Sequence, residues 1–290
     1  MLRFVTTADT EILATAAAVE RLPEGFPEVR CANPATAIDQ DAFVEDVLRD
    51  ARVVLCRILG GRRGWPVGFD LLRARCEERG IALVALGGEV EPDAEMTAAS
   101  LAPAGTVAQA GEYLRHGDVE NVEQLLRFLA DTLLLEGHGF APPRELPDLG
   151  VYVPGVGDVE LADALARRDA TRPTVGVCFY RSHRITGNSA FVDALCAALD
   201  AGANALAVWS TTLRRDADGR VPALELLDGH VDALLTTMLA TGGSGAADTG
   251  AAPGEGVSDD WQAWDATALA ALDVPVIQAV CATASRTAWE

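Results

Sequence analysis

Basic residues are scarce in this sequence of 290 residues, with 23 Lys and Arg against 43 Asp and Glu and a net charge of −20. Proteins that bind nucleic acid or anionic membranes need clustered basic residues to neutralise phosphates, so we expect neither as a partner. Long apolar runs are also missing, and none approaches the 18 residues needed to cross a bilayer. The first seven residues do not form a secretory signal, and we therefore expect a cytoplasmic protein.

Paired cysteines and common catalytic motifs are absent as well. No Cys-x-x-Cys pair occurs among the six cysteines, which excludes a local zinc-ribbon or thioredoxin-type motif and predicts reduced residues in the core. The nucleotide P-loop, the Gly-x-Ser-x-Gly elbow and the His-Glu-x-x-His motif are missing too, so we do not expect this chain to bind ATP. The four histidines are scattered, and His116 and His138, which border turns, are expected on the surface.

What the sequence does contain is apolar material in a regular alternation. Hydrophobic residues make up 49% of the chain, which is enough to form a packed core. Short runs rich in Val, Ile, Leu and Cys alternate with longer stretches of helical period, and this pattern is typical of a mostly parallel sheet covered by helices. We therefore predict an α/β fold with two lobes of Rossmann-like or flavodoxin-like architecture.

The expected elements divide between these lobes. Strands are predicted at 2–6, 28–31, 53–58, 81–86, 150–154, 174–180, 205–209, 231–235 and 274–280, the last of them buried. Helices are predicted at 10–22, 41–49, 65–79, 159–168, 189–199 and 261–272, with a helical pattern over 95–135. The first lobe is 1–140 and the second is 148–290, joined by a proline-rich connection. A Gly-rich and Ala-rich stretch at 241–256 is typical of a mobile insertion, and the end of the sequence close to a strand suggests a fragment of a longer chain.

The densest polar cluster, Tyr180–Asn188, directly follows a predicted strand and precedes a helix. The carboxyl ends of strands in open α/β sheets face ligand-binding crevices, and the N–H groups of the following helix favour an anionic ligand. Arg181 is a candidate for a bidentate contact, with Ser182 and Asn188 beside it, and His183 is a candidate metal ligand or proton shuttle. The alternative is that Arg181 and His183 satisfy backbone carbonyls around a tight turn.

A second candidate site is the glycine-rich turn that follows the predicted strand 53–58. Gly60 and Gly61 permit close approach of the backbone to a ligand, and Arg57 and Arg62 supply positive charge. The alternative is a turn whose arginines pair with surface carboxylates. We further predict that five arginines border one cleft and make it locally basic, namely Arg57, Arg62, Arg63, Arg181 and Arg184.

Several separated segments, in order, resemble the large subunit of aerobic cobaltochelatase (CobN), a family related to the H subunit of magnesium chelatase. The most specific block runs from Tyr180-Arg181-Ser182-His183 to Thr186-Gly187-Asn188. The other matching segments are 57–61, 65–68, 173–177, 189–195, 202–206, 274–280, 285–286 and 288–289. Together they span the chain from about Val53 onward.

The resemblance implies a function. Members of this family form the substrate-binding, metal-inserting subunit of an ATP-dependent chelatase, which places Co²⁺ as its substrate metal in hydrogenobyrinic acid a,c-diamide during cobalamin synthesis. Separate AAA+ partner subunits hydrolyse the ATP, in keeping with the missing P-loop. Family members are several times longer, so the resemblance implies an N-terminal segment that is not catalytically complete alone. It also implies cobalt delivery by His183 and a contact of Arg181 with a peripheral carboxylate of the corrinoid.

Two other functions stay open from the residues themselves. One is a non-catalytic binding module for an acidic small molecule or a partner protein. The other is an independent Rossmann-type transferase. The nucleotide fingerprint that such an enzyme needs begins at Gly155-Val156-Gly157, but Glu160 occupies its third glycine position, which counts against this function.

Overall fold

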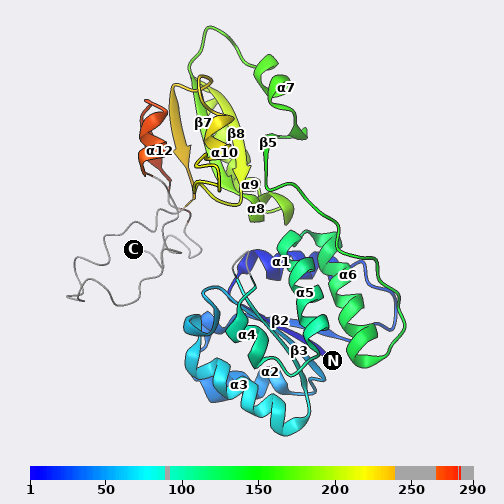
Figure 1. Cartoon of the computed structure of the whole chain (residues 1–290). Coiled ribbons are helices and arrows are strands. Elements are labelled where there is room, and N and C mark those ends of the chain that lie inside the picture. The colour runs from blue at the N-terminus through cyan, green and yellow to red at the C-terminus, as the bar shows by residue number, and fades with distance from the viewer. Residues whose placement is uncertain (89–91, 239–265, 280, 282–290) are drawn as a thin grey trace, which may run out of the picture. The chain divides into compact units, whose positions relative to one another are not determined.

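The computed structural model describes residues 1–88, 92–238, 266–279 and 281, and it divides into two compact units (Figure 1). The first unit comprises residues 1–146 with 185–187, and the second comprises 147–184 with 188–290. Each unit is a mostly parallel sheet with helices packed on its faces, which confirms the predicted α/β class. No helix in the described part of the chain is long and apolar enough to span a bilayer.

Four parallel strands form the sheet of the first unit, in the order β2–β1–β3–β4. They are β1 (Leu2–Thr6), β2 (Val29–Ala32), β3 (Val53–Ile58) and β4 (Ala82–Gly87). Every residue of β1 and all but Arg57 in β3 are buried. Such burial is expected for the central strands of a parallel sheet, because helices cover both of its faces.

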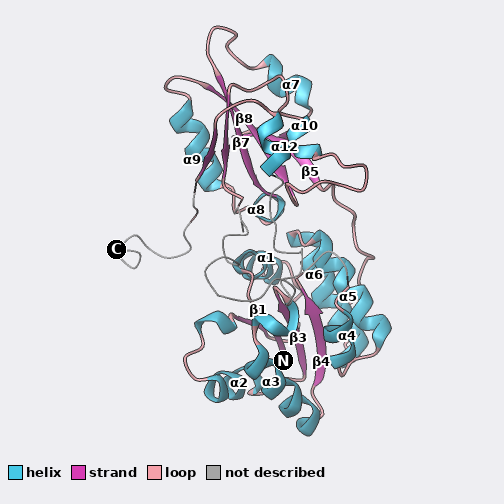
Figure 2. Ribbon diagram, turned by 60° about the vertical axis from the view of Figure 1, so that its left-hand side comes forward, coloured by secondary structure: helices cyan, strands magenta, loops and turns pink. Residues whose placement is uncertain are grey.

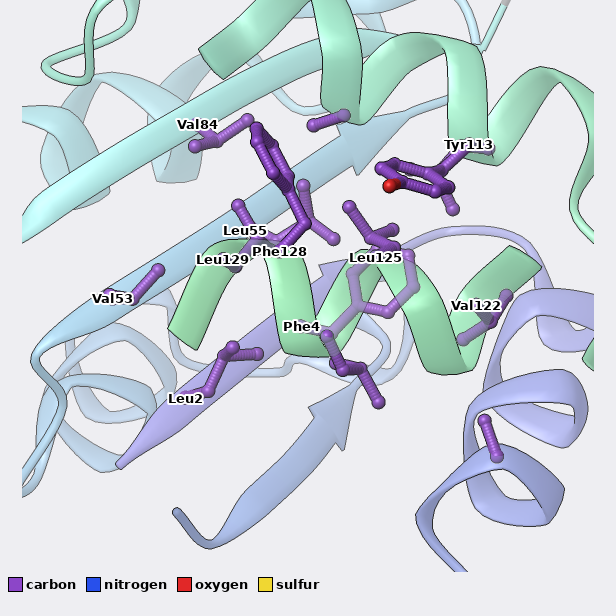
Figure 3. Packing of buried hydrophobic residues seen from close by; sticks show 14 of the residues in the cluster. Leu2, Phe4, Val53, Leu55, Val84, Tyr113, Val122, Leu125, Phe128 and Leu129 are labelled. Carbon is purple, nitrogen blue, oxygen red and sulfur yellow. The ribbon is translucent and has the colours of Figure 1, made fainter. Parts of the chain in front are cut away.

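Helices of the first unit cover both faces of its sheet (Figure 2). One face carries α1 (Asp9–Val19), α5 (Ala104–His116) and α6 (Val119–Leu129), and the other carries α2 (Gln40–Leu48), α3 (Pro66–Arg79) and α4 (Ala94–Ala99). Short helical turns also occur at Pro34–Thr36, Gly61–Gly64 and Ala130–Leu134. Figure 3 shows Leu2, Phe4 and Leu55 of the strands packed with Leu125 and Phe128 of α6.

The sheet of the second unit has the order β10–β9–β7–β8–β5–β6. Its parallel strands are β7 (Thr174–Tyr180), β8 (Asn204–Ser210), β9 (Ala233–Thr236) and β10 (Val276–Gln278), and the antiparallel pair β5 (Leu149–Val153) and β6 (Gly157–Val159) extends it beyond β8. The helices are α7 (Leu161–Ala166), α8 (Arg181–Ile185), α9 (Ala190–Leu199), α10 (Pro222–Glu225) and α12 (Ala266–Ala271). Two separate apolar clusters pack against this sheet, and Val192 and Cys196 of α9 belong to the smaller one.

Both units repeat one topology. The order β2–β1–β3–β4 of the first unit recurs as β8–β7–β9–β10 in the second. In such a sheet the chain leaves its first strand toward one side and later crosses to the other, and ligands bind where the direction reverses. This switch point lies at the carboxyl ends of β1 and β3 in the first unit and of β7 and β9 in the second. The two candidate turns therefore each border the switch point of their own sheet, since one follows β3 and the other follows β7.

Some predicted elements differ from the observed ones. The helical pattern over 95–135 is broken into α4, α5 and α6, and Gly117 ends α5 in the left-handed conformation (φ +57°) that glycine tolerates best. The predicted loop after β7 contains the short helix α8. The strand predicted as buried at 274–280 is shorter, and all three residues of β10 are exposed, because β10 is the edge strand of its sheet.

Further differences concern the segments 150–160 and 241–256 and two histidines. The Gly155–Gly157 segment is the turn of the antiparallel β5–β6 hairpin and not the start of a nucleotide fingerprint. His116 is only 5% exposed and His138 is half-buried against Phe26, so the expected surface positions were wrong. The predicted insertion at 241–256 lies outside the described residues.

The proline-rich segment that ends the first unit is held along α5 and α6 by side chains. Asp131 accepts hydrogen bonds from the N–H groups of residues 138 and 139, and Gln124 accepts one from residue 141. Asn121 both donates to the carbonyl of Arg144 (2.9 Å) and accepts from its N–H (2.8 Å). The Nδ1 atom of His116 accepts from the N–H of Leu146 at 3.2 Å. These bonds satisfy backbone groups that no sheet pairs, which explains why His116 is buried.

The burial of the cysteines gives a test of this fold. Cys56, Cys76, Cys178 and Cys196 are buried and unpaired, whereas Cys281 is exposed. Burial raises the pKa of the thiols, to about 12 for Cys178. At pH 8 an alkylating reagent followed by mass spectrometry should therefore modify Cys281 first and the four buried thiols only after unfolding. Rapid labelling of Cys56 or Cys178 in the native chain would contradict the placement of β3 and β7 inside the two cores.

Candidate functional site

The polar turn after β7 is a compact structure in the second unit. Helix α8 begins directly at the end of the strand and carries Arg181, Ser182 and His183. Gly187 then turns the chain in the left-handed conformation (φ +75°), and the N–H of Asn188 donates to the carbonyl of His183 at 2.8 Å. Helix α9 starts two residues later without a side-chain cap on its free N–H groups. The turn therefore presents a histidine, an asparagine and a helix start at the switch point.

His183 lies half-buried in the centre of this turn. Its ring makes an edge contact with Phe191 (centroids 4.9 Å apart) and lies 6.4 Å from the ring of Tyr180. Its Nδ1 atom is 3.5 Å from the side-chain nitrogen of Asn188. Burial lowers the pKa of His183 from its ordinary value of 6.5, because desolvation disfavours the charged imidazolium. The imidazole is therefore neutral at pH 7.

The arginines of this turn tie α8 to its surroundings. Arg181 is 6% exposed, and its Nε donates to the carbonyl of Pro147 at 2.7 Å. Arg184 donates to Asp158 at 2.7 Å and lies over the ring of Tyr152, with its guanidinium carbon 5.0 Å from the ring centroid. Asp158 also accepts from the indole of Trp209 at 2.9 Å. Arg181 thus donates to a backbone carbonyl, but that carbonyl lies 34 residues away and outside the turn. A ligand carboxylate at Arg181 would have to reach a nearly buried guanidinium.

Arg57 has a comparable supporting role in the first unit. It forms an ion pair with Glu11, and both side chains are at most 15% exposed. It also donates to the carbonyls of Gly87 and Gly88, each at 3.1 Å. The hydroxyl of Thr6 donates to the other oxygen of Glu11 at 2.5 Å. The switch point of the first sheet is therefore occupied by this internal ion pair, which a ligand would have to displace.

The glycines of the same turn also have structural partners. Gly60 and Gly61 both have positive φ angles (+78° and +62°), which explains the choice of glycine. A Cβ atom at Gly61 would lie 2.2 Å from a carboxylate oxygen of Asp93. The Asp93 side chain therefore makes the close approach to the backbone that was predicted for a ligand. Arg62 pairs with exposed Asp70 (2.7 Å) and Glu95 (3.0 Å).

Arg63 differs from its neighbours in the first turn. It is exposed and makes no hydrogen bond or ion pair with the residues that the structure describes. Among the described residues, no carboxylate would compete with an anionic ligand for Arg63. The exposed pairs of Arg62 are also weak competitors, because water screens such pairs.

The structure thus groups the predicted residues by unit. Arg57, Gly60, Gly61 and Arg62 belong to the first unit, and Arg181, Ser182, His183 and Asn188 to the second, so one shared cleft remains a prediction. Arg214 and Arg215, which follow β8 at the same sheet edge as α8, were not among the residues predicted for the site. The position of both arginines shortly after a hydrophobic strand is the sequence feature that could have identified them as candidate site residues. Within the described segments, no three His, Cys, Asp or Glu side chains are close enough to hold a metal ion.

Comparisons with known proteins place this geometry in context. A family model described as CobN/Magnesium Chelatase matches residues 111–290. A relative from Pseudomonas aeruginosa, described as aerobic cobaltochelatase subunit CobN, is 31% identical over 98% of this chain and 22% of its own length. A relative of the same description from Sinorhizobium sp is 27% identical over 99% of this chain and 22% of its own length.

A solved structure is also similar to this chain. It is described as the catalytic subunit of cobaltochelatase from Mycobacterium tuberculosis, with 36% identity and a TM-score of 0.58. The similarity covers 99% of this chain and 22% of that protein. The chain therefore spans about a fifth of the length of the relatives that it matches.

The buried ion pair of the first unit can be tested by substitution. Glu11→Ala should lower the free energy of unfolding by about 3–5 kcal/mol, because it leaves the buried guanidinium of Arg57 without its carboxylate. Glu95→Ala is the matched control, since it removes an exposed partner of Arg62 and should change stability little. Urea denaturation followed by circular dichroism measures both. Equal effects of the two substitutions would contradict the special role of the Glu11 pair.

Proposed function

The chain belongs to the CobN/magnesium chelatase family, and we propose that it is a segment of the large subunit of a cobaltochelatase. The observation that carries this proposal is the similarity over 98–99% of the chain to proteins described as cobaltochelatase subunits, one of them 36% identical. In this proposal the segment contributes binding surface for the corrinoid substrate, hydrogenobyrinic acid a,c-diamide. The complete subunit inserts Co²⁺ as the substrate metal during cobalamin synthesis.

The insertion of a metal ion into a macrocycle requires several kinds of protein group. Bases must take the two pyrrole protons, ligands must desolvate and deliver the cation, and a pocket must hold the macrocycle. The described residues offer no ligand cluster for a cation, which supports a role in holding the ring and not in completing the reaction. We propose that Ser182, His183 and Asn188 face the substrate, while Arg57 and Arg181 hold the turns that carry the two candidate sites.

Electrostatics bears on how a polyacidic ring is held. The net charge of −20 repels a carboxylate-rich substrate unless the binding edge is locally basic. At the carboxyl edge of the second sheet, Arg181 and Arg184 follow β7, and Arg214 and Arg215 follow β8. In this proposal these four arginines contribute positive charge, which Asp148 beside Arg181 and Asp158 beside Arg184 partly offset. ATP hydrolysis is assigned to separate AAA+ subunits, because the chain has no P-loop.

Titration of the purified chain tests whether this segment binds the ring without inserting the metal. We expect the 290-residue chain to bind hydrogenobyrinic acid a,c-diamide in calorimetry, and we expect added Co²⁺ to leave the visible spectrum of the bound ring unchanged. The reason is that the proposed ring-holding edge belongs to this chain, whereas its described residues include no ligand cluster for cobalt. Absence of binding would contradict the proposed substrate surface, and cobalt insertion by this chain alone would contradict its proposed incompleteness.

Substitution of His183 tests the proposed contact. In the full-length subunit with its AAA+ partners, His183→Ala should weaken corrinoid binding about tenfold or more, the loss expected for one hydrogen bond to a charged oxygen. His230→Ala is the matched control, because His230 precedes β9 at the opposite end of the strands of the same unit. Unchanged corrinoid affinity and cobalt insertion in His183→Ala would remove this residue from the site.

A further inference from the structure

We propose that Asn188 is a positioning residue that fixes His183 as the Nε2–H tautomer, so that the imidazole donates a hydrogen bond to a ligand oxygen instead of ligating cobalt. The proposal deepens the proposed function and rests on it for the identity of the ligand. It replaces the metal role predicted for His183 with a role at the periphery of the substrate. The oxygen would belong to a carboxylate or an amide, the two peripheral groups of an a,c-diamide.

The tautomer follows from the donor and acceptor properties of the two side chains. The side-chain nitrogen of Asn188 lies 3.5 Å from Nδ1 of His183. An amide NH₂ group has protons and no accepting lone pair, so it can only donate. Nδ1 must then be the accepting, unprotonated nitrogen. A neutral imidazole whose Nδ1 accepts carries its proton on Nε2.

The backbone keeps the two residues in this relation. The N–H of Asn188 donates to the carbonyl of His183 at 2.8 Å, which closes the turn between them. The ring is also held by the edge contact with Phe191. Arg184, the next residue of α8, is fixed by Asp158 and Tyr152. His183 therefore has little freedom to turn its ring and exchange the two nitrogens.

The Nε2–H group is available to a ligand. Nε2 of His183 makes no hydrogen bond with any residue that the structure describes, and it is absent from the buried unpaired nitrogens of the same residues. The side chain is only partly buried, in the helix that directly follows β7. A protonated Nε2 has no lone pair in the ring plane to give to a metal, whereas it is a good donor to an oxygen. Desolvation also lowers the pKa of His183 and keeps the ring neutral.

The tautomer can be read directly from the imidazole nitrogens. In a two-bond ¹H–¹⁵N spectrum of the ¹⁵N-labelled chain at pH 7.5, we expect the His183 ring to show an unprotonated Nδ1 and a protonated Nε2. His183→Ala assigns the signals by their loss. The tautomer itself is measured on the unchanged chain, and the variant serves only to assign the signals. A protonated Nδ1, or an even mixture of both tautomers, would overturn the proposal.

Asn188→Asp reverses the tautomer by design. A carboxylate at this position accepts the Nδ1 proton, which leaves the lone pair of Nε2 free for a metal, as carboxylate partners do for metal-ligating histidines. We expect Asn188→Asp to bind Co²⁺ about 10-fold to 100-fold more tightly than the unchanged chain, measured with Co²⁺ alone by paramagnetic broadening of the His183 signals. Ala190→Asp is the matched control, because it adds the same charge at the exposed start of α9.

The outcomes separate this inference from the proposed function. Equal Co²⁺ affinity at His183 in the unchanged chain and in Asn188→Asp would overturn the inference while leaving the chelatase segment intact. Tighter Co²⁺ binding in Ala190→Asp would overturn it too, since charge and not tautomer would then be the cause. If the Nε2–H tautomer is found but corrinoid affinity is the same in His183→Ala, the donor role fails together with the proposed contact.

Discussion

Both faces of the parallel sheet in the first unit are buried, and this burial restricts where polar side chains can lie. The central strands β1 and β3 have almost no exposed residue, because helices cover each face. Polar side chains are therefore concentrated where strands end. The shared strand order of the two units adds a second constraint, since it defines one switch point in each sheet. Both polar turns singled out in the sequence lie at such a point.

The two switch points are filled in different ways. In the first unit, Glu11 and Arg57 pair with each other at the place where a ligand would bind. In the second, Nε2 of His183 makes no hydrogen bond with any described residue at the corresponding edge. All 23 basic residues of the chain are arginines. Several of them serve as ties between loops by donating to backbone carbonyls, as Arg57, Arg168 and Arg181 do. A planar guanidinium with five donors suits this use.

The sequence was sufficient to predict strands and helix ends that are determined by neighbouring residues in the chain. The apolar runs gave β1, β3 and β7 within one residue at each end, and Gly80 ends α3 in the expected left-handed conformation. Features that depend on distant partners were not predictable. Arg57 and Glu11 are 46 residues apart, and nothing in either neighbourhood indicates the pair. The five-residue helix α8 is too short to show a period, and the exposure of β10 depends on its place at the edge.

The proposal that matters most for function is that the turn after β7 faces the ligand through His183 and Asn188. Its most direct test is chemical-shift mapping of the isotopically labelled 290-residue chain as hydrogenobyrinic acid a,c-diamide is added. We expect the largest shifts on residues 182–190. Shifts confined to the first unit, with none in that turn, would contradict it.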